Sequence, residues 1–591
     1  MENEEAMSND MTKILLTLNL KYLNQDIIKH NIEEVVDKLE SLDEEKEKHK
    51  YLCLSCIFGA FLGDSMGSCC EFSSPSPKNH LDIFAFKNGI FGPGEVTDDS
   101  EMAMSSAFAY MDAINEDPSK IQDIIYYYFC VWRCSGPKDI GNATSSALRF
   151  WNGQSIEETK FIYKIVKTSN WGSLANGFLM RISTFITYYY YTHLEKIYNV
   201  IQNFFSVENN DITEEIINLY FDIYTESSKN TEITHPNYEN GISSAVFTLM
   251  TLTGMVTKDA SKVYSLFKKI TNYKTFFDCH TDKFQHYIAL ETQEKYGKII
   301  NEVETNNITP VYSQMGYYIH GFKLSVYNVK KLADMGTNIE DDIYYKMMCD
   351  VCDFGGDTDT NCAIVGAMIG PLIGYKNFNK TYFDEFIRFV PYQRCQFNSA
   401  FMYIYVDYLE EQILKGKKIE PNINNIQTEN NNLKVGMDNS SPKNNNEMEI
   451  EENIKTGEKK EETEVKKDEA GVKKEEIEVK GEETGVKKEG IVEKKEETEI
   501  KTEVKAVETE VKDDAGVKDE EGVKKGETEV KKEEIKEGVK KEIKEEIKTE
   551  VKGEIKEEEK KNDGLKDKYL KKTKHTAFKK IMEFLTKEID I

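Results

Sequence analysis

Two acidic segments with the residue types of a metal site lie in distant parts of the chain. Residues 97–99 read Thr-Asp-Asp and residues 355–360 read Gly-Gly-Asp-Thr-Asp-Thr, each between a turn and the expected start of a helix. One side-chain oxygen is enough to cap a helix, and an acidic group also complements the helix dipole. The two segments together supply four carboxylates and several hydroxyls. Capping alone therefore does not account for them.

These oxygens favour the binding of hard divalent cations. Neighbouring carboxylates repel one another unless a positive charge lies between them. Carboxylate and hydroxyl oxygens, without histidine or thiolate, prefer Mg²⁺ or Mn²⁺ to Zn²⁺. Because the ligands come in two groups from distant segments, the pattern suits a site for two metal ions.

A third segment combines small residues with two acids. Gly59, Gly63 and Gly67 share one helical face, which predicts close packing against another helix. Asp64 and Glu71 are spaced so that they would also share a face if the helix continues. Two acids on a buried helix need polar or charged partners.

Three blocks together resemble the ADP-ribosylglycohydrolase family. They are residues 63–71 (GDSMGSCCE), 97–100 (TDDS) and 355–361 (GGDTDTN). Shorter blocks agree with the same family, at residues 137–144 (PKDIGNAT), 176–181 (NGFLMR) and 234–236 (THP). The resemblance covers residues 51–415 and rests on the order and spacing of the blocks.

The resemblance implies an all-α fold, two Mg²⁺ ions (Mn²⁺ being the alternative), and cleavage of the bond from ADP-ribose to an acceptor. The acceptor would be a protein side chain such as Ser or Arg, or the acetyl group of O-acetyl-ADP-ribose. Glu71 resembles a glutamate of the branches that act on ADP-ribosyl-serine and O-acetyl-ADP-ribose. Carried over by position, the metal ligands would be Thr97, Asp98, Asp99, Asp357, Asp359 and Thr360, and the ADP-ribose pocket would be lined by Ser173, Asn176, Gly177 and His235.

The implied chemistry is coherent with these residues. Glycosidic cleavage passes through a cationic, sugar-like transition state. Bridged metal ions orient ribose hydroxyls and lower the pKa of a bound water, and a carboxylate holds that water or moves its proton. Glu71 and either Asp98 or Asp99 are the catalytic candidates. The alternative is an inactive family member that binds ADP-ribose or has a structural role, but the six filled ligand positions favour a hydrolase.

Three features depart from the family pattern. Ala175 stands where glycine is more usual, and its methyl group would crowd a phosphate or require a different backbone. Ser100 replaces a common threonine. Residues 185–233 are rich in Tyr and Asn and have no recognised counterpart, so we expect an insertion or an irregular segment there.

The elements that must hold these residues are expected to be helices. Apolar spacing between residues 51 and 418 is mostly three to four, as at Met104, Ala107, Phe108 and Met111, and strict alternation is scarce. We therefore expect an all-α catalytic domain, a multi-helix orthogonal bundle, over residues 51–418. Residues 1–50 should form a polar helical extension, in which residues 12–18 have the apolar content to dock on the domain and residues 39–50 form a charged connector.

The C-terminal part of the chain has a different composition. Residues 419–560 are a Lys- and Glu-rich low-complexity tail with isolated Val and Ile, which predicts disorder. Residues 561–591 should form a basic amphipathic helix. That helix fits a partner protein, a membrane surface, the catalytic domain, or simple exposure to solvent.

Charge and cysteine content narrow the class of protein. The net charge is −28, of which residues 421–591 contribute −9 and the first 420 residues −19. This argues against binding of duplex nucleic acid and fits the collection of cations. The eleven cysteines lie in apolar runs, which indicates reduced thiols in a soluble cytoplasmic or nuclear protein. The start of the chain lacks the basic residues of a signal peptide, and the apolar stretch at 362–374 is too short to span a membrane.

For the cysteines and three histidines, structural roles are weighed against metal-binding or reactive roles. Residues 53 and 56 together with 349 and 352 have the spacing of a four-cysteine zinc site, but their apolar helical context favours buried thiols. Oxidation of Cys69 or Cys70, beside Glu71, would disturb the site. His280, His286 and His320 are expected in surface or core roles.

Overall fold

The computed structural model describes residues 25–77, 91–114, 116–149, 170–207, 211–273, 276, 283–336, 340–390 and 398–414. The chain divides into two units, Met1–Pro421 and Asn422–Ile591, and all described residues lie in the first. Four of the sequence predictions fall outside the described residues. They concern the tail at 419–560, the terminal helix at 561–591, the docking segment at 12–18 and His280.

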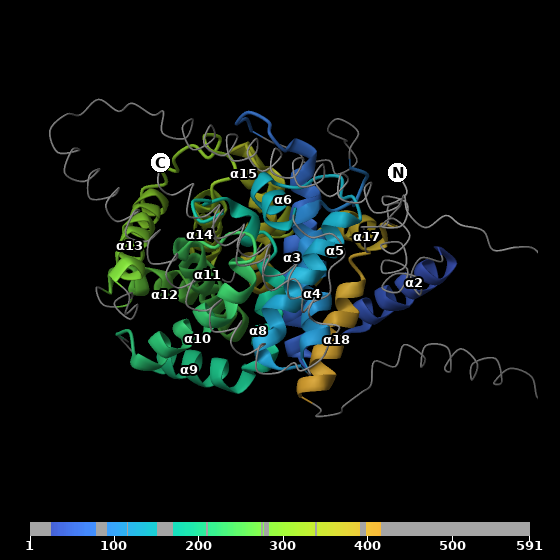
Figure 1. Ribbon diagram of the computed structural model, residues 1–591, viewed down its shortest axis with the longest axis horizontal. Helices are drawn as coiled ribbons and strands as arrows, with labels where there is room; N and C mark the ends of the chain where they lie inside the picture. The colour runs from blue at the N-terminus through green and yellow to red at the C-terminus, as the bar shows by residue number, and fades with distance from the viewer. Residues whose placement is uncertain are drawn as a thin grey trace, which may run out of the picture. The chain divides into compact units, whose positions relative to one another are not determined.

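The described residues form an all-α structure, as predicted (Figure 1). They contain no strands, and only two isolated β-bridges join Ser73 to Gly356 and Ala175 to Tyr317. The α-helices are α2 (Gln25–Ser41), α3 (Lys48–Gly67), α4 (Asp98–Ala113), α5 (Ile121–Cys134), α6 (Asn142–Leu148), α8 (Ile182–Thr192), α9 (Leu194–Ser206), α10 (Glu214–Thr231), α11 (Tyr238–Thr257), α12 (Ala260–Asn272), α13 (Lys283–Glu304), α14 (Tyr318–Met335), α15 (Ile343–Asp353), α16 (Thr358–Ile373), α17 (Lys380–Arg388) and α18 (Phe401–Ile413). Short 3₁₀ turns lie at η1 (Ser68–Cys70), η2 (Pro118–Lys120), η3 (Asn176–Phe178) and η4 (Tyr375–Asn377).

Helices α3 and α16 form the centre of the domain and pack antiparallel with their backbones in contact. A methyl group on Gly59 would collide with the Gly366 carbonyl, and one on Gly67 would collide with the Thr358 carbonyl. The glycine face of α3 therefore serves close helix packing, as predicted. Because the helices run antiparallel, the end of α3 lies against the start of α16. This arrangement brings the third predicted segment to the second acidic turn.

The prediction of an irregular segment at residues 185–233 is wrong. This part of the chain forms α8, α9 and α10, and the side chains of Tyr189, Tyr190 and Tyr220 are fully buried. Along α9 the buried residues Ile197, Ile201 and Phe204 follow helical spacing. The segment is rich in Tyr and Asn, which masked this periodicity in the sequence.

Helix α2 lies in the predicted N-terminal extension, of which residues 25–50 are described. Its residues Val35, Val36 and Leu39 are buried in the core, and it packs against α17 and α18. The predicted connector at 39–50 is partly helical, since α3 already begins at Lys48. Lys50 is buried and pairs with Asp407 at 2.7 Å.

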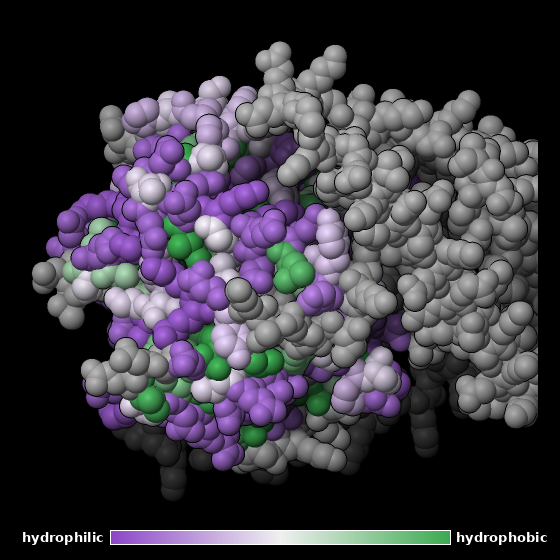
Figure 2. Space-filling model, turned by 90° about the vertical axis from the view of Figure 1, so that its left-hand side faces the viewer, coloured by the Kyte–Doolittle hydropathy of each residue, from purple (hydrophilic) through white to green (hydrophobic). Residues whose placement is uncertain are grey.

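The surface of the described residues shows no large apolar area on the face in Figure 2, where hydrophobic side chains appear as separate small spots. One helical stretch, Lys48–Cys70, is long and apolar enough to cross a membrane, which was not expected from the sequence. The most apolar 18 residues of this stretch are 89% buried inside the protein. Such burial is typical of the core helix of a folded domain.

Candidate active site

The starts of α4 and α16 meet, so the two acidic turns predicted from the sequence converge. The hydroxyls of Thr97 and Thr360 both donate to Oδ2 of Asp99, at 3.2 and 3.3 Å. The other carboxylate oxygen, Oδ1 of Asp99, is buried and has no hydrogen-bond partner among the described residues. A buried acceptor without a donor is costly. A cation at this oxygen would remove that cost.

Asp64 holds the start of α4 in place. Its carboxylate accepts hydrogen bonds from the backbone N–H groups of Thr97 and Ser100, at 3.0 and 3.2 Å, and from the Ser100 hydroxyl at 2.5 Å. These donors are the partners that a buried acid requires. Burial raises the pKa of Asp64 to about 6, and the hydrogen bonds limit that rise. Ser100, which departs from the family pattern, therefore keeps a donor role.

Glu71 reaches the site by a turn. Helix α3 ends at Gly67 and η1 follows, so the α-helix does not continue to Glu71 and the condition for Asp64 and Glu71 to share one helical face is not met. Phe72, directly after Glu71, adopts a left-handed backbone with φ 55° and donates its N–H to the Gly356 carbonyl at 2.7 Å. Such a conformation is strained for a large side chain. The structure thus directs Glu71 into the acidic site at a local cost.

Gly355 and Gly356, in the second acidic turn, allow this turn to contact the segment after Glu71. Gly355 and Gly356 have φ values of 67° and 78°, in the left-handed region that favours glycine. A side chain on Gly355 would collide with the Ser73 carbonyl, and Gly356 donates its N–H to the same carbonyl at 3.0 Å. The segment after Glu71 and the turn before Asp357 are therefore tied together.

A candidate cation site results from this connection. Glu71, Asp357 and Asp359 each offer a ligand oxygen, and these atoms all lie within 4.8 Å of one another. The sequence placed Glu71 among the catalytic candidates and the two aspartates among the metal ligands, so the structure brings both sets together. The donors are carboxylates, which suit a hard divalent cation.

Burial and mutual repulsion shift the acids strongly. The pKa of Asp98, Asp99 and Asp359 is raised well above the usual range, first by burial and then by the neighbouring carboxylates. After burial, Asp139 is the largest contributor to the raised pKa of Asp98. Asp139 lies in the block at 137–144, but no role for it was predicted from the sequence. A divalent cation fits the site because it would offset this repulsion.

The predicted substrate loop borders the acids. The Asn176 amide donates to Oδ2 of Asp357 at 2.7 Å, and the Asn176 N–H donates to the Gly316 carbonyl at 2.8 Å. Ala175 lies in extended backbone with φ −69° and ψ 156°, which any residue adopts, so its methyl group forces no unusual conformation. Ser173 precedes this turn, and its carbonyl accepts from Asn240 at 2.9 Å.

The remaining pocket candidates, Gly177 and His235, lie against each other. A Cβ on Gly177 would stand 2.8 Å from Cε1 and 3.3 Å from Nε2 of His235. His235 is buried, and burial followed by the charge of Arg181 lowers its pKa to about 3. The imidazole is therefore neutral at physiological pH.

The cysteine pairs do not assemble a zinc site. Sγ of Cys352 lies 3.6 Å from Sγ of Cys362, and the only cluster of three potential ligands in the described residues is the acidic one. Cys53, Cys56, Cys349 and Cys352 are buried cysteines. The preference for structural thiols is confirmed.

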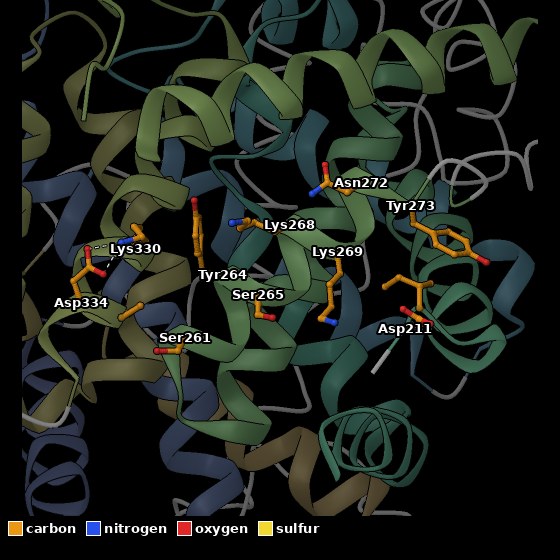
Figure 3. A pocket seen from close by; sticks show the side chains of 12 residues that line it. Asp211, Ser261, Tyr264, Ser265, Lys268, Lys269, Asn272, Tyr273, Lys330 and Asp334 are labelled. Atoms are coloured by element: carbon orange, nitrogen blue, oxygen red, sulfur yellow. Dashed lines mark hydrogen bonds and ion pairs between the residues drawn. The ribbon is translucent and has the colours of Figure 1, made fainter. Parts of the chain in front are cut away.

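A separate cavity of about 660 Å³ lies between α12, α14 and the segment after α9 (Figure 3). Lys268, Lys269, Lys330 and Tyr264 are among its lining residues. Lys330 pairs with Asp334, and Lys268 pairs with Glu304. None of the predicted site residues lines this cavity, so it is distinct from the acidic site.

The chain is similar in sequence to known ADP-ribosylglycohydrolases. The family model described as ADP-ribosylglycohydrolase matches residues 46–387. A protein of Acanthamoeba polyphaga mimivirus, named as a putative ADP-ribosyl glycohydrolase, is 25% identical over 358 residues, covering 58% of this chain and 92% of the relative. A solved structure described as an ADP-ribosylglycohydrolase-related protein complex matches with 14% identity and a TM-score of 0.40, over 61% of this chain and 97% of the other.

The chain belongs to the ADP-ribosylglycohydrolase family, because the family model covers more than half of its length. Family membership makes it a hydrolase of ADP-ribosyl glycosidic bonds. The acidic cluster adds a candidate site for a metal ion.

Proposed function

We propose that this chain uses two Mg²⁺ ions to hydrolyse the bond between ADP-ribose and an acceptor. The acceptor is a serine or arginine side chain of a protein, or the acetyl group of O-acetyl-ADP-ribose. Six residues from the two turns would hold the ions: Thr97, Asp98, Asp99, Asp357, Asp359 and Thr360. The observation that supports this most is the contact of Thr97 and Thr360 with one carboxylate oxygen of Asp99, whose other oxygen has no partner among the described residues.

The donor set supports the choice of metal. Carboxylates and threonine hydroxyls are hard ligands, and no thiol or imidazole belongs to the described acidic cluster. Bound in this site, Mg²⁺ would orient the ribose hydroxyls and lower the pKa of an attacking water.

The chain's own residues would handle the substrate and the proton. Glu71 lies within reach of Asp357 and Asp359, and its carboxylate would accept the proton of the attacking water. The Asn176 amide, fixed by Asp357, and the Gly177 backbone would position the nucleotide beside the acids. Asp98 or Asp99 is the second catalytic candidate.

A substrate panel tests this proposal. The full chain is incubated with ADP-ribosyl-serine peptide, ADP-ribosyl-arginine and O-acetyl-ADP-ribose, in parallel with the Asp359→Ala variant. We expect Mg²⁺-dependent release of ADP-ribose from at least one substrate and loss of that release in the variant. No release from any substrate rejects the proposed activity, and full activity of Asp359→Ala rejects the metal assignment.

A further inference from the structure

Arg181, directly before α8, is a fully buried cation without an ion pair among the described residues. Its guanidinium donates to the Gly177 carbonyl at 2.6 Å, to the Thr234 hydroxyl at 2.8 Å, and to the Asn230 side chain at 2.9 Å. The side chain is 0% exposed, and its charge lies 4.6 Å from the centre of the Phe129 ring. A buried charge without an opposite charge is costly. Such a residue needs a reason beyond packing.

The hydrogen bonds from Arg181 have a defined direction. A guanidinium only donates, so the Thr234 oxygen must act as acceptor toward Arg181. The same Thr234 oxygen lies 2.8 Å from Nδ1 of His235. The Thr234 oxygen has a second lone pair, so this contact alone leaves its bond to His235 open. The threonine hydrogen, however, has no other acceptor among the described residues, and we therefore assign it to Nδ1 of His235. Nδ1 accepts a hydrogen bond only when it carries no proton.

The neutral imidazole of His235 must in that case carry its hydrogen on Nε2. Nε2 is buried and has no hydrogen-bond partner among the described residues. Nε2 faces the backbone of Gly177, because a Cβ added to Gly177 would lie 3.3 Å from it. The Thr144 side chain faces the same position. A buried N–H without an acceptor points to a ligand oxygen.

We propose that Arg181 is a positioning residue, which through Thr234 fixes His235 in the tautomer that presents an Nε2–H donor to a phosphate or hydroxyl oxygen of ADP-ribose. The ligand named here rests on the proposed function. Arg181 also holds the Gly177 carbonyl, so one guanidinium orders both the loop and the histidine that face the nucleotide.

The tautomer is tested by nitrogen NMR on the full chain labelled with ¹⁵N-histidine, with the His235 signals assigned from a His235→Gln variant. Thr234→Val removes the hydroxyl and keeps the shape, and Thr234→Ser restores it. Thr231→Val is the matched control, because Thr231 is a buried threonine of α10 whose hydroxyl bonds to Ser244 at 2.9 Å. Arg181→Lys keeps the positive charge and loses the planar guanidinium, whose N–H groups donate to Gly177, Asn230 and Thr234.

We expect a protonated Nε2 in the wild-type chain and in Thr231→Val and Thr234→Ser. In Thr234→Val and Arg181→Lys we expect a mixture of tautomers and an affinity for ADP-ribose, measured by calorimetry, that falls roughly tenfold or more. A protonated Nδ1 in the wild-type chain overturns the proposal, and so does equal ADP-ribose affinity of Thr234→Val and Thr231→Val. A purely structural Arg181 would lower stability without moving the tautomer. The tautomer is measured without ligand, so this result is separate from a failure of the proposed function, which would appear as absent ADP-ribose binding by the wild-type chain.

Discussion

The Thr360 hydroxyl donates to the Asp99 carboxylate at 3.3 Å, across 261 residues of sequence. This contact joins the start of α16 to the start of α4. Each partner belongs to a different acidic turn, so a change at either residue acts on both. The contact also leaves the second oxygen of Asp99 available to a cation.

Asp99→Asn should abolish the effect of Mg²⁺ on stability. A ligand that binds only the folded state stabilises it by about 2.7 kcal/mol at a concentration of 100 times its Kd. We expect Mg²⁺ to raise the Tm of the wild-type chain and to leave the Tm of the variant unchanged in calorimetric scans. Without metal, the variant should be at least as stable as the wild type, because one repelling charge is gone.

Asp222→Asn is a suitable control for this experiment, since Asp222 is a carboxylate of α10 that pairs with Lys196, outside the acidic turns. It should keep the full Mg²⁺ response. A normal Mg²⁺ response in Asp99→Asn would remove Asp99 from the ligand set.

Glu71→Gln should separate proton transfer from metal binding. If Glu71 accepts the proton of the attacking water, the rate of ADP-ribose release falls by about 10²–10⁴-fold. Although Glu71 offers an oxygen to the acidic cluster, the six assigned ligands remain in this variant, so the affinity for Mg²⁺, measured by titration calorimetry, should stay close to that of the wild type. A parallel loss of Mg²⁺ affinity would identify Glu71 as a ligand, together with Asp357 and Asp359, and would contradict its assigned role.

Gly67→Ala should damage both stability and activity. The added methyl group would stand 2.7 Å from Cα of Asp359 and would collide with the Thr358 carbonyl, so the start of α16 must move. Overpacking of this kind costs about 1–3 kcal/mol. Urea unfolding and the rate of ADP-ribose release measure the two effects.

The matched control is Gly297→Ala on α13, where an added Cβ meets nothing within 4 Å. It should raise the free energy of unfolding by up to about 1 kcal/mol, because alanine favours the helix over glycine. If both variants behave alike, the close contact of α3 and α16 does not position the site.

Glu101 should make the free energy of unfolding of the metal-free protein depend on pH. Burial raises the pKa of Glu101 to about 8, against a hydrogen bond from the Trp132 indole at 2.8 Å. The folded state then holds a proton that the unfolded chain has released, so the free energy of unfolding decreases as the pH rises from about 4.5 to 8. Glu101→Gln should reduce this decrease by on the order of a few kcal/mol, measured by urea unfolding in chelator.

Glu195→Gln, which removes an exposed carboxylate of α9, serves as the control and should preserve the wild-type pH profile. Parallel profiles for the wild type and Glu101→Gln would contradict the assigned protonation of Glu101.

The acidic turns could be predicted from the sequence, because four carboxylates and several hydroxyls exceed what helix capping requires. Thr97, Asp99 and Thr360 meet as the metal hypothesis requires. Close packing of the glycine face of α3 could also be predicted from the sequence, since Gly59, Gly63 and Gly67 have the spacing of one helical face. Both features depend on local spacing, which the sequence displays directly.

Other features depend on packing between distant segments and were not readable. The end of α3 at Gly67 changes the position of Glu71, and no local pattern marks that end. The capping of α4 by Asp64 requires the contact between two helices. The tyrosines of α8 are buried because α3, α4, α11 and α18 pack against this helix, whereas composition alone suggested an irregular segment.

The converging turns are proposed to form a metal-dependent hydrolytic site, on which every catalytic role above depends. ADP-ribose release by the full chain is therefore measured after treatment with chelator and then during a titration with Mg²⁺. We expect no release in chelator and saturable recovery with Mg²⁺ in the wild type, with no recovery in Asp359→Ala. Release that continues unchanged in chelator, or recovery of the variant to the wild-type rate, would contradict a metal-dependent site.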